Sequence, residues 1–550
     1  IVFNEITKTA IQSAIQNPRT LDMDLVNAQQ ARQGLDYIIG FDISPVLWKH
    51  VRNKISAGRC QSPTLKLICE KEDIICKFSS ETYFNLEGIF KLKKNGTELN
   101  SKSAHIFKSK EKVLESLGEF QKSIFTISDI VKSQSKQSPS PPYITSTIQQ
   151  DASSKFGMSP KITMGHLQKL YEKGKITYMR TDSKVISTQC VNSIKKYVKD
   201  TYGTSYYQFR KYANTNKNAQ EAHECIRPVN INVVDLVGDV NEYEKKLYSM
   251  IWKRTIACQM KDLLKEVVKL KIGNNRNNIL FESLFEKTIF LGYGIVYNYE
   301  LTNEIDTLLN KVKKKDIVNS KIIQSNECLT SPPPRFTEAS LIKDLEKKGI
   351  GRPSTFSSIV DTLFKREYIK KETSNGIEKE MSIIKLRKVI TENTKNTKIN
   401  SYKNKIIVSD LGKEVNTFMC EHFNNILKVN FTSNMENLLD KIAKGEYRCV
   451  DLVDKVYKTF HPVVEKLLKT KTNKKTRWDN KNNKPILGIN PLNNENIYAY
   501  KGKFGPVIQE GDNAPRYVGV PKKLNIDNLD LEQCLTLLEY PKCIGTFEKK

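Results

Sequence analysis

The sequence contains no pair of cysteines in Cys-x-x-Cys spacing, although 11 cysteines are scattered over its 550 residues. Zinc ribbons and knuckles need such close pairs to place two thiolates on one tetrahedral ion, so we expect no zinc site. An odd number of scattered cysteines indicates free thiols in a reducing compartment. No apolar run approaches the roughly 18 residues that cross a bilayer, which excludes an integral membrane protein.

Acidic residues are scarce relative to basic ones, with 61 Asp and Glu against 89 Lys and Arg and a formal net charge of +28. This balance excludes an acidic solvating chain and indicates a polyanionic partner, nucleic acid first and an anionic membrane surface second. No basic amphipathic helix with an aromatic apolar face is visible, so a membrane partner is the less favoured alternative. Hydrophobic residues make up 39%, as in globular chains.

The pattern of apolar residues and turn signals divides the chain into alternating helical and β-rich segments. The predicted elements are a helix over 22–40 that ends at Gly40, a helix from Ser62-Pro63, strands over 79–130 with a turn at Asn95-Gly96, a linker over 131–142, helices over 145–173 and 240–265, strands over 266–330, helices after Pro334, a loose hairpin or partly disordered insertion over 371–405, a basic linker, and a small mixed unit over 480–550. Two β-rich stretches therefore bracket an inserted helical segment.

The segment Gly174–Ser183 holds a tyrosine between apolar residues and an arginine. If it is extended, Ile176, Tyr178 and Arg180 share one face. A phenol has a pKa near 10, so a nucleophilic tyrosine needs nearby cations that stabilise phenolate and phosphate charge. The alternative is a half-buried strand tyrosine with an exposed arginine.

Three further segments carry polar groups suited to a phosphate. His223 in Glu221–Pro228 can donate to a phosphate oxygen or move a proton; the alternative is a histidine bonded to a backbone carbonyl. Arg32 and Asp36 lie at i,i+4, so the carboxylate can orient the guanidinium, unless they form an ordinary surface ion pair. Ser56–Pro63 is a small-residue loop with Arg59 that enters a helix.

A helix–turn–helix is predicted over 336–364, with a first helix stopped at Gly349 and a second after Ser354. It presents Arg352, Ser354 and Thr355 at a helix N-terminus, where phosphate binds well. A purely structural helical hairpin is the alternative.

Taken together, these segments resemble the type IA DNA topoisomerases. The resemblance covers nearly the whole chain and is carried, in the family's order, by NAQQARQGLDYIIGFDISPVLW (27–48), SAGRCQSPTLKLICEKE (56–72), PPYITSTIQQDAS (141–153), GKITYMRTDS (174–183), EAHECIRP (221–228), RFTEASLIKDLEKKGIGRPSTFSSIV (335–360) and VNFTSNMENLLDKIAKG (429–445). It implies a multidomain α+β fold: a toroidal body with helical, helix–turn–helix-like domains and a β-rich arch, plus a small C-terminal repeat.

The domain limits that the resemblance implies are a helical body over 1–78 and 333–468, a β-rich arch over 79–140 and 265–332, a helical domain with the tyrosine over 141–264, a basic linker over 469–479 and a C-terminal repeat over 480–550. The GKFGP segment of that repeat favours the bacterial relaxing enzymes over a decatenating topoisomerase III-like enzyme. A non-catalytic single-strand-binding relative is the other alternative, and the intact Tyr178-Met179-Arg180 argues against it.

The resemblance also assigns roles to residues. Tyr178 would attack a phosphodiester of a single strand and form a 5′-phosphotyrosyl link, Arg180 would stabilise the transition state, and His223 would contact the phosphate. The residues implied in DNA binding are Arg32, Gln33, Asp36, Phe41, Trp48, Ser56, Ala57, Gly58, Arg59, Cys60, Gln61, Arg180, Arg352, Ser354, Thr355 and Gly412. The family often has Arg where Gln33 stands, so one phosphate contact would be weaker.

The family's cofactor is Mg²⁺, held by an N-terminal TOPRIM domain that would precede Ile1, so we expect no metal ligands here and no activity from these 550 residues alone. The link through phosphotyrosine keeps the bond energy, so no ATP is expected and no P-loop is visible. The expected partner is single-stranded DNA within negatively supercoiled duplex, bound by a monomer, with no membrane. Lys-, Asn- and Ile-rich usage indicates an AT-rich source, such as a large DNA virus; the location would be the cytoplasm or nucleoid, or a viral factory.

Overall fold

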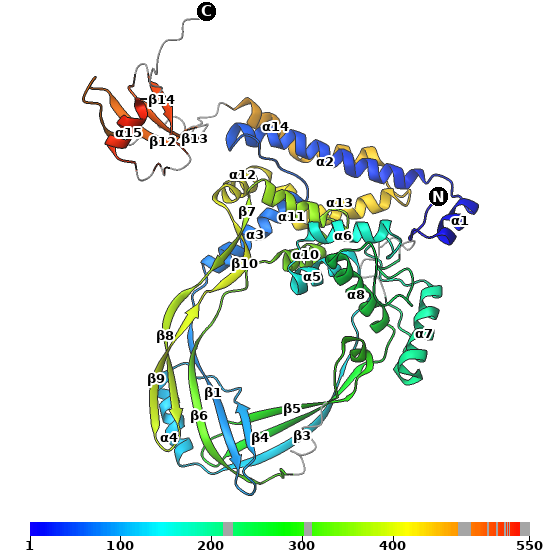
Figure 1. The fold of residues 1–550 in the computed structure, drawn as a ribbon, viewed down its shortest axis with the longest axis vertical. Coiled ribbons are helices and arrows are strands. Elements are labelled where there is room, and N and C mark those ends of the chain that lie inside the picture. Colours follow the sequence, from blue (N-terminus) through cyan, green and yellow to red (C-terminus); the bar gives the residue numbers. More distant parts are fainter. Residues whose placement is uncertain are drawn as a thin grey trace, which may run out of the picture. The chain divides into compact units, whose positions relative to one another are not determined.

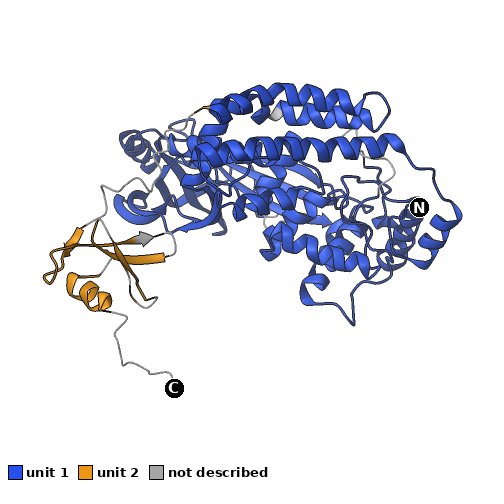
Figure 2. Ribbon diagram, turned by 90° about the horizontal axis from the view of Figure 1, so that it is seen from above, with its two compact units in different colours: residues 1–469 blue, residues 470–550 orange. Residues whose placement is uncertain are grey.

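The computed structural model describes residues 1–212, 224–301, 311–470, 486–502, 505–512, 515–521, 524, 526 and 529–539. These fall into two compact units, residues 1–469 and 470–550, which Figure 2 colours separately. Within the described residues, no helix has the length and apolar character needed to span a membrane.

The helical body of the first unit is built on one hydrophobic cluster that joins both ends of that unit. Its helices are α2 (Met23–His50), α3 (Gln61–Cys76), α10 (Glu338–Lys348), α11 (Phe356–Lys365), α12 (Asp410–Leu427), α13 (Val429–Ile442) and α14 (Cys449–Lys469). The helix predicted over 22–40 does not end at Gly40 as expected, because α2 continues through Gly40 to His50. Its buried residues recur every three or four positions, as Leu35, Ile39 and Ile43 do, and this apolar stripe continues past the glycine.

A second helical group carries the tyrosine segment. It contains α5 (Thr145–Phe156), α6 (Pro160–Glu172), α7 (Thr188–Tyr202) and α8 (Glu242–Ala257), which share a cluster of buried side chains. The predicted helical stretch 145–173 is two helices: Gly157 ends α5 in the left-handed conformation, and Ser159 caps α6. A short helix α1 (Lys8–Gln16) precedes α2.

The eight-stranded sheet of the first unit has antiparallel neighbours and closes on itself. Its strands are β1 (Thr82–Leu92), β2 (Glu98–Lys102), β3 (Phe125–Gln137), β4 (Leu263–Asn274), β5 (Phe281–Phe290), β6 (Ile317–Leu329), β8 (Ile377–Leu386) and β9 (Ile390–Ile399), in the order β1-β2-β5-β4-β3-β6-β8-β9, with β1 also paired to β6. Helix α4 (Lys110–Gln121) adds Phe120 to a core that includes Phe90, Phe125 and Phe281. In Figure 1 this sheet leaves the helices and returns to them, so the ribbon of the unit forms a ring.

Two predicted irregular segments are regular strands. The predicted linker 131–142 is strand up to Gln137, because β3 pairs with β4 along its whole length. Residues 371–405 were predicted as a loose hairpin or a partly disordered insertion, and the hairpin is confirmed. β7 (Ile369–Ser374) pairs with β10 (Tyr402–Val408), and between them β8 and β9 form a hairpin whose Ile384 and Leu386 enter the sheet's core. The polar sequence reflects a ribbon exposed on most of its surface, where backbone pairing keeps the strands extended.

The second unit is a four-stranded antiparallel meander of β11 (Ile486–Ile489), β12 (Asn496–Gly502), β13 (Gly505–Glu510) and β14 (Arg516–Gly519), with helix α15 (Leu531–Leu538). Ile497, Ile508 and Cys534 lie in its own small core. The predicted domain limits stay predictions. Each of the four hydrophobic clusters draws on one predicted domain, with two exceptions: η2 (Gly292–Tyr297) packs in the cluster of the tyrosine-bearing helices, and β8 packs in the cluster of the β-rich arch.

Candidate active site and nucleic-acid interface

Tyr178 is held by the backbone of two segments far from it in sequence. On one side, Thr177 donates its hydroxyl to the Cys225 carbonyl at 2.7 Å and accepts from the Arg227 N–H at 2.9 Å. On the other side, the Thr145 hydroxyl donates to the Met179 carbonyl at 2.7 Å. Three of the motifs singled out in the sequence, around residues 145, 178 and 225, therefore meet around the tyrosine.

The expectation of an extended strand with Ile176, Tyr178 and Arg180 on one face is wrong. Ile176 makes only an isolated bridge to Pro228, and the segment is irregular. Ile176, Thr177 and Met179 are all buried, whereas Tyr178 is half-buried and Arg180 exposed. Side-chain hydrogen bonds take the place of a ladder here, and this lets the Tyr178 ring lie at 5.2 Å from Tyr171 in an edge contact.

The N-terminal residues run past the tyrosine segment. The Tyr178 N–H donates to the Asn4 carbonyl at 2.8 Å, and Glu5 pairs with Arg227 at 3.1 Å. Gly174 has a φ of +62°, and a Cβ there would lie 2.7 Å from the Ile6 carbonyl oxygen. A glycine is thus required where the N-terminal segment crosses. His223 lies outside the described residues, although Glu224 next to it pairs with Arg227 at 2.5 Å.

A network of arginines and carboxylates joins α2 to α13 and to the loop before α3. The predicted pairing of Arg32 with Asp36 is wrong: Asp36 instead accepts from Arg59 at 2.8 Å, and Arg32 pairs with Glu436 at 3.0 Å. Arg59, one of the residues that the resemblance implies in DNA binding, is buried, and its second partner is Glu436. Burial by itself would lower the pKa of Arg59, but the carboxylates of Glu436 and Asp36 outweigh it, and the net pKa is raised.

The loop over residues 56–61 is braced from several directions. The Tyr368 hydroxyl donates to the Ser56 carbonyl at 2.7 Å and accepts from its N–H at 2.9 Å. The Gln61 amide donates to the same carbonyl at 2.9 Å, and the Ala57 and Gly58 N–H groups donate to Ser44 and Ser62 hydroxyls at 3.3 and 3.2 Å. Burial raises the pKa of the Cys60 thiol to about 11, so it stays protonated.

Helix α2 carries exposed aromatic side chains at positions outside its buried apolar stripe. Phe41 is 73% exposed and its ring centroid lies 6.0 Å from that of Tyr37. Gln33 donates to the Tyr37 hydroxyl at 3.2 Å. Trp48 is exposed on one face while its indole N–H donates to the Ile55 carbonyl at 2.5 Å. Such rings can stack nucleic-acid bases; Tyr37 was not among the predicted residues.

The predicted helix–turn–helix is confirmed as α10 and α11. The Thr355 hydroxyl accepts from the Arg352 N–H at 2.8 Å and closes the turn, and Ser354 is exposed on it. Arg352 turns away from the helix to Glu436, at 3.1 Å, and to Asp440, at 3.1 Å.

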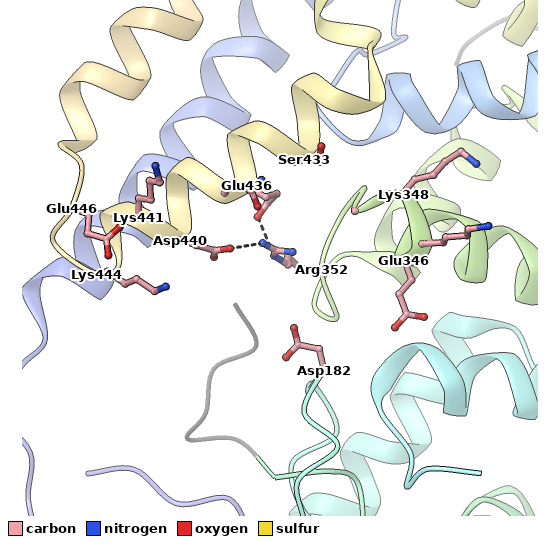
Figure 3. A pocket seen from close by; sticks show the side chains of 13 residues that line it. Asp182, Glu346, Lys348, Arg352, Ser433, Glu436, Asp440, Lys441, Lys444 and Glu446 are labelled. Atoms are coloured by element: carbon pink, nitrogen blue, oxygen red, sulfur yellow. Dashed lines mark hydrogen bonds and ion pairs between the residues drawn. The ribbon is translucent and has the colours of Figure 1, made fainter. Parts of the chain in front are cut away.

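A polar cavity of about 780 Å³ lies beside this turn (Figure 3). Asp182, four residues after Tyr178, reaches it from the tyrosine segment, and Glu436 and Asp440 reach it from α13 with Arg352 between them. The cavity therefore connects the tyrosine segment with the arginine network.

Gly412 is buried near the start of α12 and faces backbone. A Cβ there would lie 2.2 Å from the Tyr368 carbonyl oxygen. The structure thus gives Gly412 a supporting part, because it lets α12 pack on the backbone of Tyr368, directly before β7. Glu436, Asp440, Tyr368 and Thr177 are the site residues that sequence reasoning missed; the Glu436–Asp440 spacing of i,i+4 within the 429–445 motif was the available signal.

Among the described residues, no group of three or more His, Cys, Asp or Glu side chains could hold a metal ion. The described side chains therefore do not by themselves fit a magnesium site.

Known proteins with similar sequences and structures identify the family of this chain. A family model described as DNA topoisomerase matches residues 20–396, and one described as topoisomerase C-terminal repeat matches residues 490–545. A "DNA topoisomerase 1 type prokaryotic" of Acanthamoeba polyphaga mimivirus is 36% identical over 99% of this chain and 68% of its own length; a "DNA topoisomerase 1" of Rickettsia bellii is 34% identical over 100% and 76%. The solved structure of full-length topoisomerase I from Thermotoga maritima matches 95% of this chain and 81% of its own, with a TM-score of 0.69 and 29% identity. The chain belongs to the type IA DNA topoisomerases of the prokaryotic kind.

Proposed function

We propose that Tyr178 cleaves one DNA strand and that the enzyme thereby relaxes negatively supercoiled DNA. The phenol oxygen, having given up its proton, attacks the phosphorus; a P–O bond to Tyr178 forms, the bond to the 3′-oxygen breaks, and that oxygen takes up a proton. A second strand passes, and the 3′-hydroxyl then attacks the phosphotyrosine and releases the phenol. Phosphodiester bonds are conserved, so the cycle balances without ATP.

The observation that carries this proposal is the meeting of three motifs around Tyr178. The hydrogen bonds of Thr145 and Thr177 fix the backbone on both sides of the tyrosine, while its ring stays half-buried and Arg180 stays exposed. A phosphate at the phenol could thus reach Arg180, whose charge stabilises the extra negative charge of the transition state. His223 is proposed as a second phosphate contact.

The strand is proposed to lie along α2 and the 56–61 loop. There Phe41, Tyr37 and Trp48 offer ring faces for bases, and Arg32, Arg352 and the α11 N-terminus offer charge for phosphates. Type IA topoisomerases generally depend on Mg²⁺ and not on ATP; for this protein both are proposals.

The test is a covalent adduct between the full-length protein and a single-stranded oligonucleotide, with Mg²⁺ present. A 3′-end label should travel with the protein after denaturation and a 5′-end label should not, because the protein keeps the 5′-phosphate. Tyr178→Phe should abolish the adduct, whereas Tyr171→Phe, which changes the neighbouring ring in the same way, should keep it. An adduct that survives Tyr178→Phe, or that carries the 5′ label, would refute the proposal.

A further inference from the structure

Glu436 on α13 is a buried carboxylate with three guanidinium partners. Its side chain is 2% exposed. One oxygen accepts from Arg59, and the other accepts from Arg32 at 3.0 Å and lies 3.1 Å from the Nε of Arg352. These arginines come from α2, from the loop before α3 and from the α10–α11 turn, so a single side chain ties three separate segments together.

The carboxylate is charged in this setting. Burial alone would raise the pKa of Glu436, but the guanidinium groups of Arg59, Arg32 and Arg352 outweigh it, and the net pKa is lowered. The three arginines face three carboxylates in all, because Asp36 pairs with Arg59 and Asp440 with Arg352. The charges are therefore balanced without any further ion.

The three arginines are not equivalent. Arg59 is buried and has both partners inside the protein, so it acts as an internal tie. The side chains of Arg32 and Arg352 are 32% and 24% exposed, so both are more accessible than that of Arg59, which is 2% exposed. The Nε of Arg32 is buried and has no hydrogen-bond partner among the described residues, so this guanidinium is held by Glu436 alone of the described carboxylates.

We propose that Glu436 is a positioning residue for the DNA strand: it fixes the planes of Arg32 and Arg352 so that both meet consecutive phosphates. The inference rests on the proposed function, since it takes the strand to pass these arginines. A guanidinium donates from fixed directions, so holding its plane before DNA arrives removes the rotamer entropy that binding would otherwise cost.

Glu436→Asp is the informative variant, because it keeps the charge and shortens the reach by one methylene. One carboxylate can then no longer meet three arginines at hydrogen-bond distance. For single strands, log K falls with log salt concentration by about 0.7 per neutralised phosphate. We expect the slope for a labelled single-stranded oligonucleotide to become shallower by about 0.7–1.4 and the affinity to fall about tenfold or more.

Glu72→Asp is the matched control. Glu72 is also a buried glutamate paired with an arginine, Arg335, at 2.9 Å in the same helical body, but it has no contact with the network. It should lower the melting temperature as Glu436→Asp does and leave the DNA slope unchanged. If a purely structural role were correct, both variants would lose stability and neither would change the slope.

Two further variants keep the inference testable should Glu436→Asp not fold. Asp440→Asn removes one partner of Arg352 and should make the slope shallower by about 0.7. Glu436→Gln removes a negative charge, so if Glu436 acted only through its charge, DNA binding would tighten; positioning requires it to weaken.

The outcomes separate the two proposals. Wild-type protein that shows no salt-dependent binding of single strands contradicts the proposed function. Wild-type protein that binds, together with Glu436→Asp or Asp440→Asn at wild-type slope, or Glu436→Gln with tighter binding, overturns the role of Glu436 and leaves the proposed function standing.

Discussion

Replacing Gly412 by alanine should disturb the 56–61 loop from the far side of the helical body. The added Cβ would lie 2.2 Å from the Tyr368 carbonyl oxygen, against an ordinary carbon–oxygen contact of about 3.3 Å, so α12 or the backbone of residue 368 must move by about 1 Å. Overpacking of this kind costs about 1–3 kcal/mol, and a rigid carbonyl puts the cost near the upper end. The helix preference for alanine returns up to about 1 kcal/mol, so we expect a net local loss of about 2 kcal/mol.

Backbone hydrogen exchange measures this loss where it occurs. A local loss of about 2 kcal/mol corresponds to roughly 30-fold faster exchange, expected in peptides over 409–415 and, through the Tyr368 hydroxyl, over 55–61. Gly165→Ala is the control, because Gly165 is a helical glycine in α6 with open space around it, and it should slow exchange or leave it unchanged. Exchange in Gly412→Ala within twofold of the wild type would refute the packing argument.

Three other variants test neighbouring contacts. Tyr368→Phe leaves the Ser56 N–H without its 2.9 Å acceptor and removes the 2.7 Å donor to the Ser56 carbonyl, which keeps the Gln61 amide. This should cost about 1–3 kcal/mol and lower single-strand affinity in an anisotropy titration; unchanged affinity would contradict it. Thr177→Val removes the buried hydroxyl beside Tyr178 and should cut the yield of covalent adduct about tenfold or more, whereas Thr177→Ser should keep it. Burial raises the pKa of Glu346, so its stabilising contribution is present below the ordinary carboxyl pKa and is lost as pH rises through the raised value; Glu346→Gln should flatten the melting-temperature profile across that window, and a profile parallel to wild type would count against this.

The sequence was informative wherever the structure depends on local pattern. The helix–turn–helix around Gly349 and Ser354 was predicted because caps and an apolar stripe specify it locally. For the ribbon from residue 369 to 408 the sequence left a hairpin and partial disorder both open, because its polar, Lys- and Asn-rich strands carry no alternation, and their order comes from pairing with each other and with β6.

The arrangement of the site depended more on contacts distant in sequence. Arg32 and Asp36 are neighbours on one helix face, and the sequence paired them, yet each finds a better partner across the body, 404 and 23 residues away. Likewise the sequence alone did not decide whether the tyrosine segment is extended, whereas buried threonine hydroxyls decide its irregular conformation.

The sequence by itself determined the family, the tyrosine and the order of the motifs, because those follow from residue identity and spacing along the chain. Only the tertiary structure decided that the sheet closes through β1 and β6, that Gly412 supports Tyr368, and that Glu436 joins three arginines. The physical reason is that a buried charge needs counter-charges close to it, and the packing of separate helices decides which charged groups are close. The spacing of residues along the sequence does not give the distance between side chains on different helices.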